Sequence, residues 1–292
     1  MDKNEKKKRI ANLHTYSSES YGNLSPVELV KMAKKSGLYA LAITDRDTLK
    51  GIKELLADGN DYGIELIPGV EMSVSADSDM HILGLFVDPE NEELKRVIEN
   101  AQDEKQRFIN RAIKQLKRLE IEIDAEELKR RKVLAVNDFM DYLNETKVFS
   151  TEAETKAFFG KLYFEWKSEM PDPQKCFETI HRAEGIAILA HPLVLGLRDE
   201  ELKKLLLKLK RKGLDGIEVY HPEHTEEYEA TLLKYAKELD LLVSGGSGLL
   251  ERAIGEQAEE KYRKGVAYEE VEAMKKRIAE YMNDFDIIRT FE

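Results

Sequence analysis

The feature that most restricts the fold of this chain is a repeated alternation of short apolar runs with amphipathic helical patterns. Strand-like runs occupy residues 39–43 and 81–87, with a turn predicted between them at Pro68-Gly69. The same alternation returns after residue 173. Strands that alternate with helices are typical of βα units, so the sequence predicts an α/β fold with a largely parallel sheet or barrel.

The middle of the chain follows a different pattern. From about residue 91 to 169 the sequence is mostly helical and strongly charged, and it begins with a long amphipathic helix. We therefore predict a helical subdomain inserted into one barrel, with residues 1–90 as the first part and residues 170–292 as the second part with a C-terminal helix. Such an insertion acts as a lid over the barrel mouth or simply packs against it, and the sequence leaves both roles open.

The composition is that of a heavily charged globular protein. The chain has 292 residues, enough for one large α/β domain or two smaller ones, and its net charge is -11. Non-specific binding to a nucleic-acid backbone needs a concentrated basic face, so this charge argues against it but allows a small anionic ligand in a local positive pocket. No apolar run is long enough to span a membrane, and the charged residues 2–9 do not resemble a signal peptide, so we predict a cytoplasmic protein.

Residues that commonly bind metals stand at or near the ends of several predicted strands. They are His14, Asp45, Glu71, His81, His191, Glu218 and His221. In barrels of this kind the strand ends meet at one mouth, where catalytic and metal-binding side chains gather. Imidazole and carboxylate groups suit zinc, manganese or iron. A lone histidine is more often structural, but such residues on five separate strands predict a metal site at the mouth.

Seven short motifs occur in a fixed order along the chain. They are Asn12-Leu13-His14-Thr15-Tyr16-Ser17, Thr44-Asp45-Arg46-Asp47-Thr48, Pro68-Gly69-Val70-Glu71, His81-Ile82-Leu83-Gly84, Ala190-His191-Pro192, Gly216-Ile217-Glu218-Val219-Tyr220 and Gly245-Gly246-Ser247-Gly248. In this order they resemble the polymerase and histidinol phosphatase (PHP) family of metal-dependent phosphoesterases. The resemblance is strongest to the branch that acts on nucleoside 3',5'-bisphosphates and on the 5' ends of short RNAs. It implies a distorted seven-stranded (βα)7 TIM-like barrel with a three-metal site at its mouth.

The chain departs from the family pattern at five of the nine metal-ligand positions that the resemblance implies. Those five positions hold Tyr16, Tyr21, Arg46, Gly248 and Leu250. The four ligands that remain are His14, Glu71, His81 and His191. As the family assigns its metals, the last three of these form one complete set, so the resemblance implies one divalent ion (Zn, Mn or Fe), or none where the site is wholly inactive. Two histidines and a carboxylate with open positions are able to hold such an ion and to activate water.

Arg46 is the substitution that bears most on function. A guanidinium is permanently charged and forks onto phosphate, so it replaces part of the positive charge of a missing metal without its Lewis acidity. The alternative is that Arg46 only pairs with a nearby carboxylate, Asp45, Asp47 or Glu19.

Two functions fit this pattern. In the first, the protein is a phosphoesterase in which water activated at the metal site attacks phosphorus while His14 and Arg46 stabilise the developing charge. Arg46, Tyr16 and His221 then bind the substrate, a small nucleotide-like phosphate ester. In the second, the protein is a catalytically inactive relative that binds a phosphorylated ligand or a protein partner. A chain altered on purpose at its metal site would have the same sequence pattern, and the oligomeric state is open.

Overall fold

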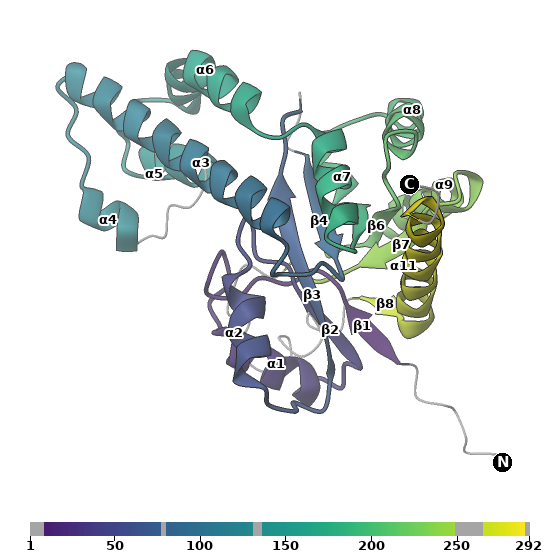
Figure 1. Cartoon of the computed structure of the whole chain (residues 1–292). Helices are drawn as coiled ribbons and strands as arrows, with labels where there is room; N and C mark the ends of the chain where they lie inside the picture. The colour runs from purple at the N-terminus through teal and green to yellow at the C-terminus, as the bar shows by residue number, and fades with distance from the viewer. Residues whose placement is uncertain (1–8, 77–79, 131–135, 249–264, 290–292) are drawn as a thin grey trace.

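The fold is built on one eight-stranded sheet that curves into a nearly closed barrel (Figure 1). The computed structural model describes residues 9–76, 80–130, 136–248 and 265–289. The strands follow one another around the sheet in the order β7-β6-β5-β4-β3-β2-β1-β8. Their bounds are β1 Ile10–Asn12, β2 Ala40–Ile43, β3 Glu65–Ser73, β4 His81–Leu85, β5 Ile186–Leu189, β6 Gly216–Tyr220, β7 Leu242–Gly245 and β8 Val266–Ala267.

The described helices fall into two groups. Those around the barrel are α1 Pro26–Lys35, α2 Lys50–Asp58, α7 Pro173–Arg182, the short 3-10 helix η1 Pro192–Leu195, α8 Asp199–Lys210, α9 Glu226–Glu238 and α11 Tyr268–Arg289. Those between β4 and α7 are α3 Glu92–Arg118, α4 Ala125–Arg130, α5 Val136–Glu145 and α6 Glu152–Glu169. This second group extends to one side of the barrel (Figure 1), where the sequence predicts an inserted helical unit. None of the described helices combines the length and the hydropathy needed to cross a bilayer.

The barrel closes where the ends of β7 and β1 meet. Leu13 N donates a hydrogen bond to Gly245 O at 3.0 Å, and Gly248 N donates to His14 O at 3.0 Å. A Cβ atom on Gly246 would lie 2.4 Å from the Cβ of His14, so a glycine is needed for the two segments to come this close. The TIM-like α/β barrel that the sequence predicts is confirmed.

The sheet differs from the prediction in the number and direction of its strands. The sequence predicts seven strands, and the structure has an eighth, β8, which pairs antiparallel with β1. Strand β4 is antiparallel to both β3 and β5, so the sheet is mixed and not largely parallel. The predicted turn at Pro68-Gly69 is wrong, because β3 continues through both residues and changes its partner there from β2 to β4. At Gly69 a Cβ atom would lie 2.8 Å from Thr44 Cγ2, which explains why the strand carries a glycine at this crossing.

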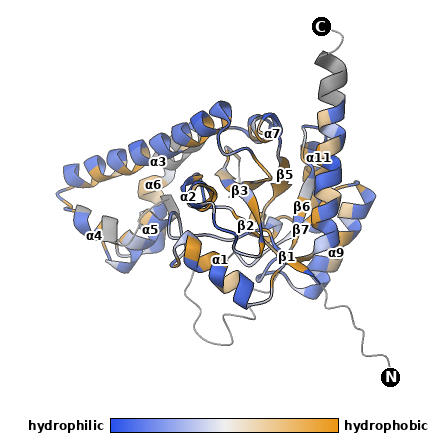
Figure 2. Ribbon diagram, turned by 60° about the horizontal axis from the view of Figure 1, so that its bottom comes forward, coloured by the Kyte–Doolittle hydropathy of each residue, from blue (hydrophilic) through white to orange (hydrophobic). Residues whose placement is uncertain are grey.

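Side chains alternate along the strands between two apolar layers. Leu41 and Ile43 of β2 pack in the cluster that includes residues of α1 and α2, whereas Ala40 and Ala42 pack in the cluster that includes residues of α11. Figure 2 shows hydrophobic strands at the centre of the barrel and helices with hydrophilic outer faces. This arrangement leaves the strand ends as the place where polar side chains meet.

Helix α3 contributes side chains to two hydrophobic clusters. Its first turns, with Leu94 and Ile98, pack in the core between the sheet and the surrounding helices. Its later turns pack around Phe108, together with Phe139 of α5 and Phe159 of α6, in a cluster of their own. The helix therefore joins the helical group to the barrel, and the division of the chain at residues 90 and 169 stays a prediction.

Candidate active site

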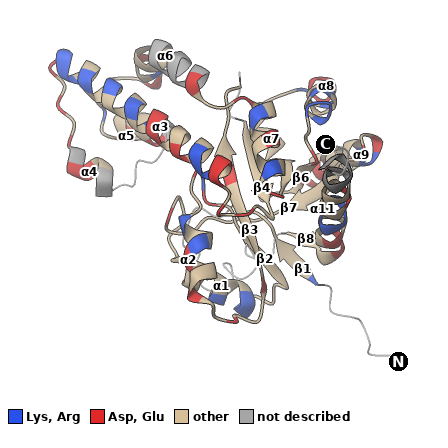
Figure 3. Ribbon diagram, in the orientation of Figure 1, with Lys and Arg blue, Asp and Glu red and all other residues tan. Residues whose placement is uncertain are grey.

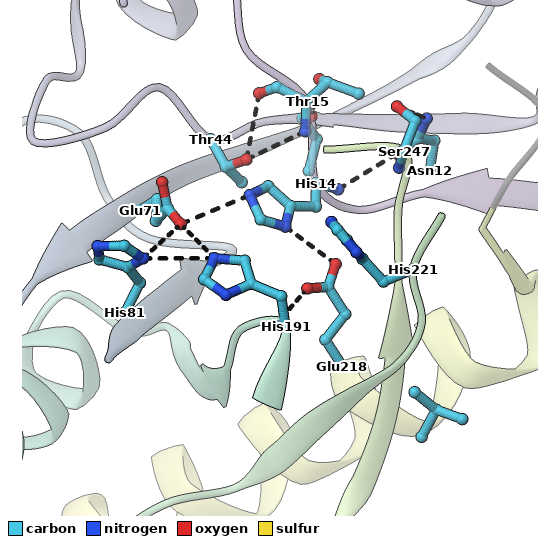
Figure 4. A network of polar contacts seen from close by, with 12 residues as sticks. Asn12, His14, Thr15, Thr44, Glu71, His81, His191, Glu218, His221 and Ser247 are labelled. Carbon is cyan, nitrogen blue, oxygen red and sulfur yellow. Dashed lines mark hydrogen bonds and ion pairs between the residues drawn. The ribbon is translucent and has the colours of Figure 1, made fainter. Parts of the chain in front are cut away.

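Strand direction brings the predicted residues to one end of the barrel. His14 and His191 follow the parallel strands β1 and β5, and Glu218 lies on β6. Strand β4 runs in the opposite direction, so its first residue, His81, lies at the same end of the barrel, beside the end of β3 that carries Glu71. Figure 4 shows these five side chains pointing toward one another.

Glu71, His81 and His191 form a compact, buried group. His191 Nε2 lies 3.1 Å from Glu71 Oε1 and 3.3 Å from His81 Nδ1, and His81 Nδ1 lies 3.5 Å from Glu71 Oε1. With metal–ligand bonds of about 2.0–2.1 Å, neighbouring ligands of a tetrahedral zinc ion stand about 3.3–3.4 Å apart. The three atoms are therefore spaced as the ligands of one divalent ion are.

The charges around this group favour the protonation states that bind metals. Burial, together with the nearby Arg46 guanidinium, holds the pKa of His81 well below its usual value, so the imidazole is neutral. Burial alone would raise the pKa of Glu71, but Arg46 and the histidines outweigh it and hold the pKa of this carboxyl well below its usual value. Neutral imidazoles and an ionised carboxylate are the forms that coordinate a cation.

Glu218 holds two of the site residues and is fully buried. Its Oε1 lies 2.9 Å from His14 Nδ1, and its Oε2 accepts a hydrogen bond from the backbone N of His191 at 2.7 Å. His191 has a φ of 26° and a ψ of 62°, a conformation that the surrounding contacts must maintain. The sequence places Glu218 at a strand end. It gives no local signal for these two contacts, because Glu218 and its partners lie on or just after three separate strands.

We expect Glu218→Gln to lower the free energy of unfolding by about 1.5–3 kcal/mol, the range found for hydrogen bonds to charged groups. Glutamine keeps the shape of the side chain but loses the charge that faces His14. Urea unfolding at neutral pH measures the difference. The control is Glu65→Gln, which removes a partly exposed ion pair with Lys275 and is expected to cost less than about 1 kcal/mol. Equal losses in the two variants would contradict a special role for Glu218.

Arg46 pairs with Glu71, and not with any of the three carboxylates near it in sequence. Its Nε donates to Glu71 Oε2 at 2.7 Å, and the Tyr16 hydroxyl donates to the same oxygen at 2.6 Å. Arg46 Nη2 lies 3.3 Å from Glu71 Oε1 and 3.3 Å from the Tyr16 oxygen. The two oxygens of Glu71 have different surroundings. Oε2 accepts the short bonds from Tyr16 and from Arg46 Nε, whereas Oε1 faces His81 and His191 and has only the longer contact with Arg46 Nη2.

One edge of the Arg46 guanidinium has no partner among the residues that the structure describes. Its Nη1 makes no hydrogen bond with the described residues. The ring of Tyr21 supports the guanidinium, with Arg46 Cζ 4.8 Å from the ring centroid, and the buried Tyr21 hydroxyl has no hydrogen-bond partner within the described part of the chain. Arg46 Nη1 therefore keeps a donor for an anion, whereas the Tyr21 hydroxyl is buried from solvent.

His221 lies beside the group and is largely buried. Its ring centroid is 5.7 Å from that of His191 and 6.2 Å from that of His14. Burial lowers the pKa of His221 to about 4, so the ring is neutral at physiological pH. Gly248, one of the positions where the family pattern has a ligand, is adjacent to the His221 ring, and Leu250 lies outside the described residues.

The barrel and the motif order can be compared with known proteins. The family model of the PHP domain matches residues 11–287. The chain belongs to the PHP domain family. It is 34% identical over 243 residues to a 5'-3' exoribonuclease of Haemophilus influenzae, and the match covers 80% of this chain and 88% of that protein. A 3',5'-nucleoside bisphosphate phosphatase of Chromobacterium violaceum is 25% identical over 253 residues, which cover 80% of this chain and 85% of that protein.

A solved structure shares the fold of this PHP domain. It is a candidate metal-dependent phosphoesterase from Bifidobacterium adolescentis, with a TM-score of 0.69 and 24% identity, and the match covers 91% of this chain and 95% of that one. The family and the branch that the motifs predict are therefore confirmed. Within the described residues of this PHP domain, Glu71, His81 and His191 are the group able to hold a divalent ion.

One polar contact beside the site of the PHP domain was not predicted from the sequence. Lys105 of α3 pairs with Asp47, the residue that follows Arg46, and only 7% of the lysine is exposed. A signal for it exists, because Lys105 lies on the buried face of α3 with Phe108 and Ala112. A lysine on an apolar stripe is seldom buried without a partner of opposite charge.

Proposed function

We propose that this PHP domain hydrolyses nucleotide-type phosphate esters with one divalent ion, Zn, Mn or Fe, held by Glu71, His81 and His191. The observation that carries the proposal is the arrangement around the Glu71 carboxylate. Its Oε1 faces the nitrogens of His81 and His191 and has one long contact with Arg46 Nη2, while its Oε2 accepts short bonds from Tyr16 and from Arg46 Nε. The relatives, an exoribonuclease and a nucleoside bisphosphate phosphatase, support a nucleotide-type ester. A cytoplasmic location is part of the same proposal.

Arg46 is the residue to which we assign phosphate binding. A bound divalent ion supplies Lewis acidity to a phosphoryl oxygen and acidifies water. Beside it, Arg46 Nη1 donates to a phosphoryl oxygen and contributes a permanent positive charge. Because Nε and Nη2 are already bonded to Glu71, the guanidinium is held in place before the ligand arrives, and its charge acts without reorganisation.

His14, Tyr16 and His221 have supporting parts in the proposal. Burial disfavours a charged imidazole, but the Glu218 carboxylate outweighs burial and raises the pKa of His14, which lets this ring stabilise negative charge on the phosphoryl group. Tyr16 has donated its hydrogen to Glu71, so it aids substrate binding by keeping Glu71 in place for Arg46. We assign His221, at the side of the group, to contact with the nucleoside.

The alternative is an inactive PHP domain that binds a phosphorylated ligand or a protein partner. The observation in its favour is that Tyr16 and Arg46 occupy the Glu71 oxygen that a further ion would need. A site with one ion lacks the two-metal clamp on the attacking and leaving oxygens. The two functions differ in a measurable property, which is release of phosphate.

We expect the wild-type protein with added Mn²⁺ to release phosphate from a nucleoside 3',5'-bisphosphate. Arg46→Met is expected to lower kcat by about 10²–10³-fold, the loss that follows removal of one preorganised donor. Arg46→Lys keeps the charge but not the planar fork, so its kcat is expected between the two. Steady-state phosphate release checks all three proteins. A wild-type protein that binds no metal and releases no phosphate even with added Mn²⁺ would reject hydrolysis and leave the binding function. An unchanged kcat in Arg46→Met would reject the role of Arg46.

A further inference from the structure

Helix α3 of the helical group reaches the chain segment that carries Arg46. Lys105 Nζ pairs with Asp47 Oδ2, and Gln102 Nε2 donates to the backbone oxygen of Asp47 at 2.6 Å. Figure 3 shows basic and acidic residues interspersed along α3. Lys105 differs from the exposed charges of this helix because it is buried against a single carboxylate.

Asp47 is held in a special backbone conformation. Its φ is 50°, in the left-handed region, which few residues other than glycine adopt, although aspartate does so more often than most. On one side β3 holds it, since Asp47 N donates to Glu71 O at 2.8 Å and its carboxylate accepts from Ser73 N and Oγ at 2.8 and 2.7 Å. On the other side Lys105 and Gln102 of α3 hold it. Asp47 is therefore clamped between the barrel and the helical group.

The position of Arg46 depends on this clamp. Arg46 immediately precedes Asp47, and its backbone forms an isolated bridge with Glu71, the residue that its side chain also contacts. A change in the left-handed corner at Asp47 would turn the Arg46 peptide away from β3 and remove the guanidinium from Glu71.

We propose that Lys105 and Gln102 are positioning residues that hold Arg46 in its phosphate-binding place, so that the helical insertion completes the phosphate site. The inference rests on the proposed function of Arg46. The packing of α3 supports it, because the same rigid helix belongs to the barrel core at its start and to the insertion core further along (Figure 1). The insertion is neither a detached lid nor passive packing, since its first helix supplies contacts that the site residues need.

The test is a double-mutant cycle with inorganic phosphate as the ligand and Mn²⁺ as a separate ligand, both measured by calorimetry on the full chain. Lys105→Met is expected to weaken phosphate binding by about 10–100-fold, the loss that follows when a hydrogen bond to a charged group is removed. It is expected to change Mn²⁺ affinity as Arg46→Met does, because both variants take the guanidinium away from the metal ligand Glu71. In an Arg46→Met background Lys105→Met is expected to add almost nothing, because coupled residues are not additive. Gln102→Ala is expected to act in the same direction with a smaller loss, and Lys105→Arg is expected to restore most of the binding.

The control is Lys175→Met, which removes another contact of α3 with the barrel, the ion pair of Lys175 with Glu93, and leaves Asp47 untouched. Its phosphate affinity is expected to equal that of the wild type. If Lys105→Met fails to fold because Asp47 is left unpaired, Lys105→Met/Asp47→Asn removes both charges and takes its place in the cycle.

Three outcomes would overturn the inference. The first is wild-type phosphate affinity in Lys105→Met while Arg46→Met binds weakly, which leaves the proposed function intact. The second is an effect of Lys105→Met that adds in full to that of Arg46→Met, which indicates a general structural role for the lysine. The third is unchanged phosphate affinity in Arg46→Met itself, which rejects the proposed role of Arg46 and this inference with it.

Discussion

His81→Ala is expected to leave the purified protein without bound metal, whereas the wild type carries about one divalent ion per chain. The substitution removes one of the three atoms that converge within 3.5 Å of one another at the barrel mouth. Changes to groups that only support metal ligands weaken metal binding by about 10–100-fold, so loss of a direct ligand is expected to exceed that range. Elemental analysis after dialysis against Zn²⁺ or Mn²⁺ measures the stoichiometry, and competition with a chelator measures the affinity.

His224→Ala is the matched control for this experiment. His224 is 6% exposed and His81 is 5% exposed, and the His224 Nδ1 atom donates to the backbone oxygen of Val219 instead of facing Glu71. This variant is expected to keep wild-type metal content. A wild-type protein that binds no ion, or equal metal loss in both variants, would reject the site at Glu71, His81 and His191.

Glu71→Gln is expected to lower the free energy of unfolding by about 3–5 kcal/mol, the cost of leaving one partner of a buried ion pair uncompensated. Glu71 is fully buried and the Arg46 side chain is only 17% exposed, so water screens their interaction weakly. Glutamine also removes the charge on the oxygen that Tyr16 contacts. Denaturant unfolding in the presence of a chelator measures this change, because bound metal would stabilise the folded wild type by mass action.

The second variant in this test is Glu71→Gln/Arg46→Met, which removes both charges. It is expected to recover most of the lost stability, since replacement of both partners of a buried pair by neutral groups is often close to neutral. A double variant less stable than Glu71→Gln would show that Arg46 is stabilised by groups other than Glu71.

Much of the fold can be read from the sequence because its signals are local. The alternation of apolar runs with helical patterns depends on residues close together in the chain, and it predicts most of the barrel strands at the right places. Two errors have clear physical causes. Strand β8 is two residues long and has no periodicity of its own to detect. At Pro68-Gly69 the turn preference of the dipeptide is overridden, because β3 exchanges one neighbouring strand for another there.

The order of the motifs along the chain indicates the family and the set Glu71, His81 and His191. Such information lies in residue types and in their places at strand ends, and it needs no coordinates. The sequence alone also shows that Tyr16 and Arg46 stand where the family pattern has metal ligands. It does not show what the two replacements contact.

Only the tertiary structure decides the partners of the buried charges. Arg46 bonds to Glu71 across 25 residues, Lys105 reaches Asp47 across 58, and His14 meets Glu218 across 204. Each pair forms because the fold brings strand ends and the middle of α3 together, and no local preference encodes such a distance. The sequence determines which charged residues are present. The tertiary structure determines how they pair, because it buries these charges, and a buried charge is costly unless it has a partner.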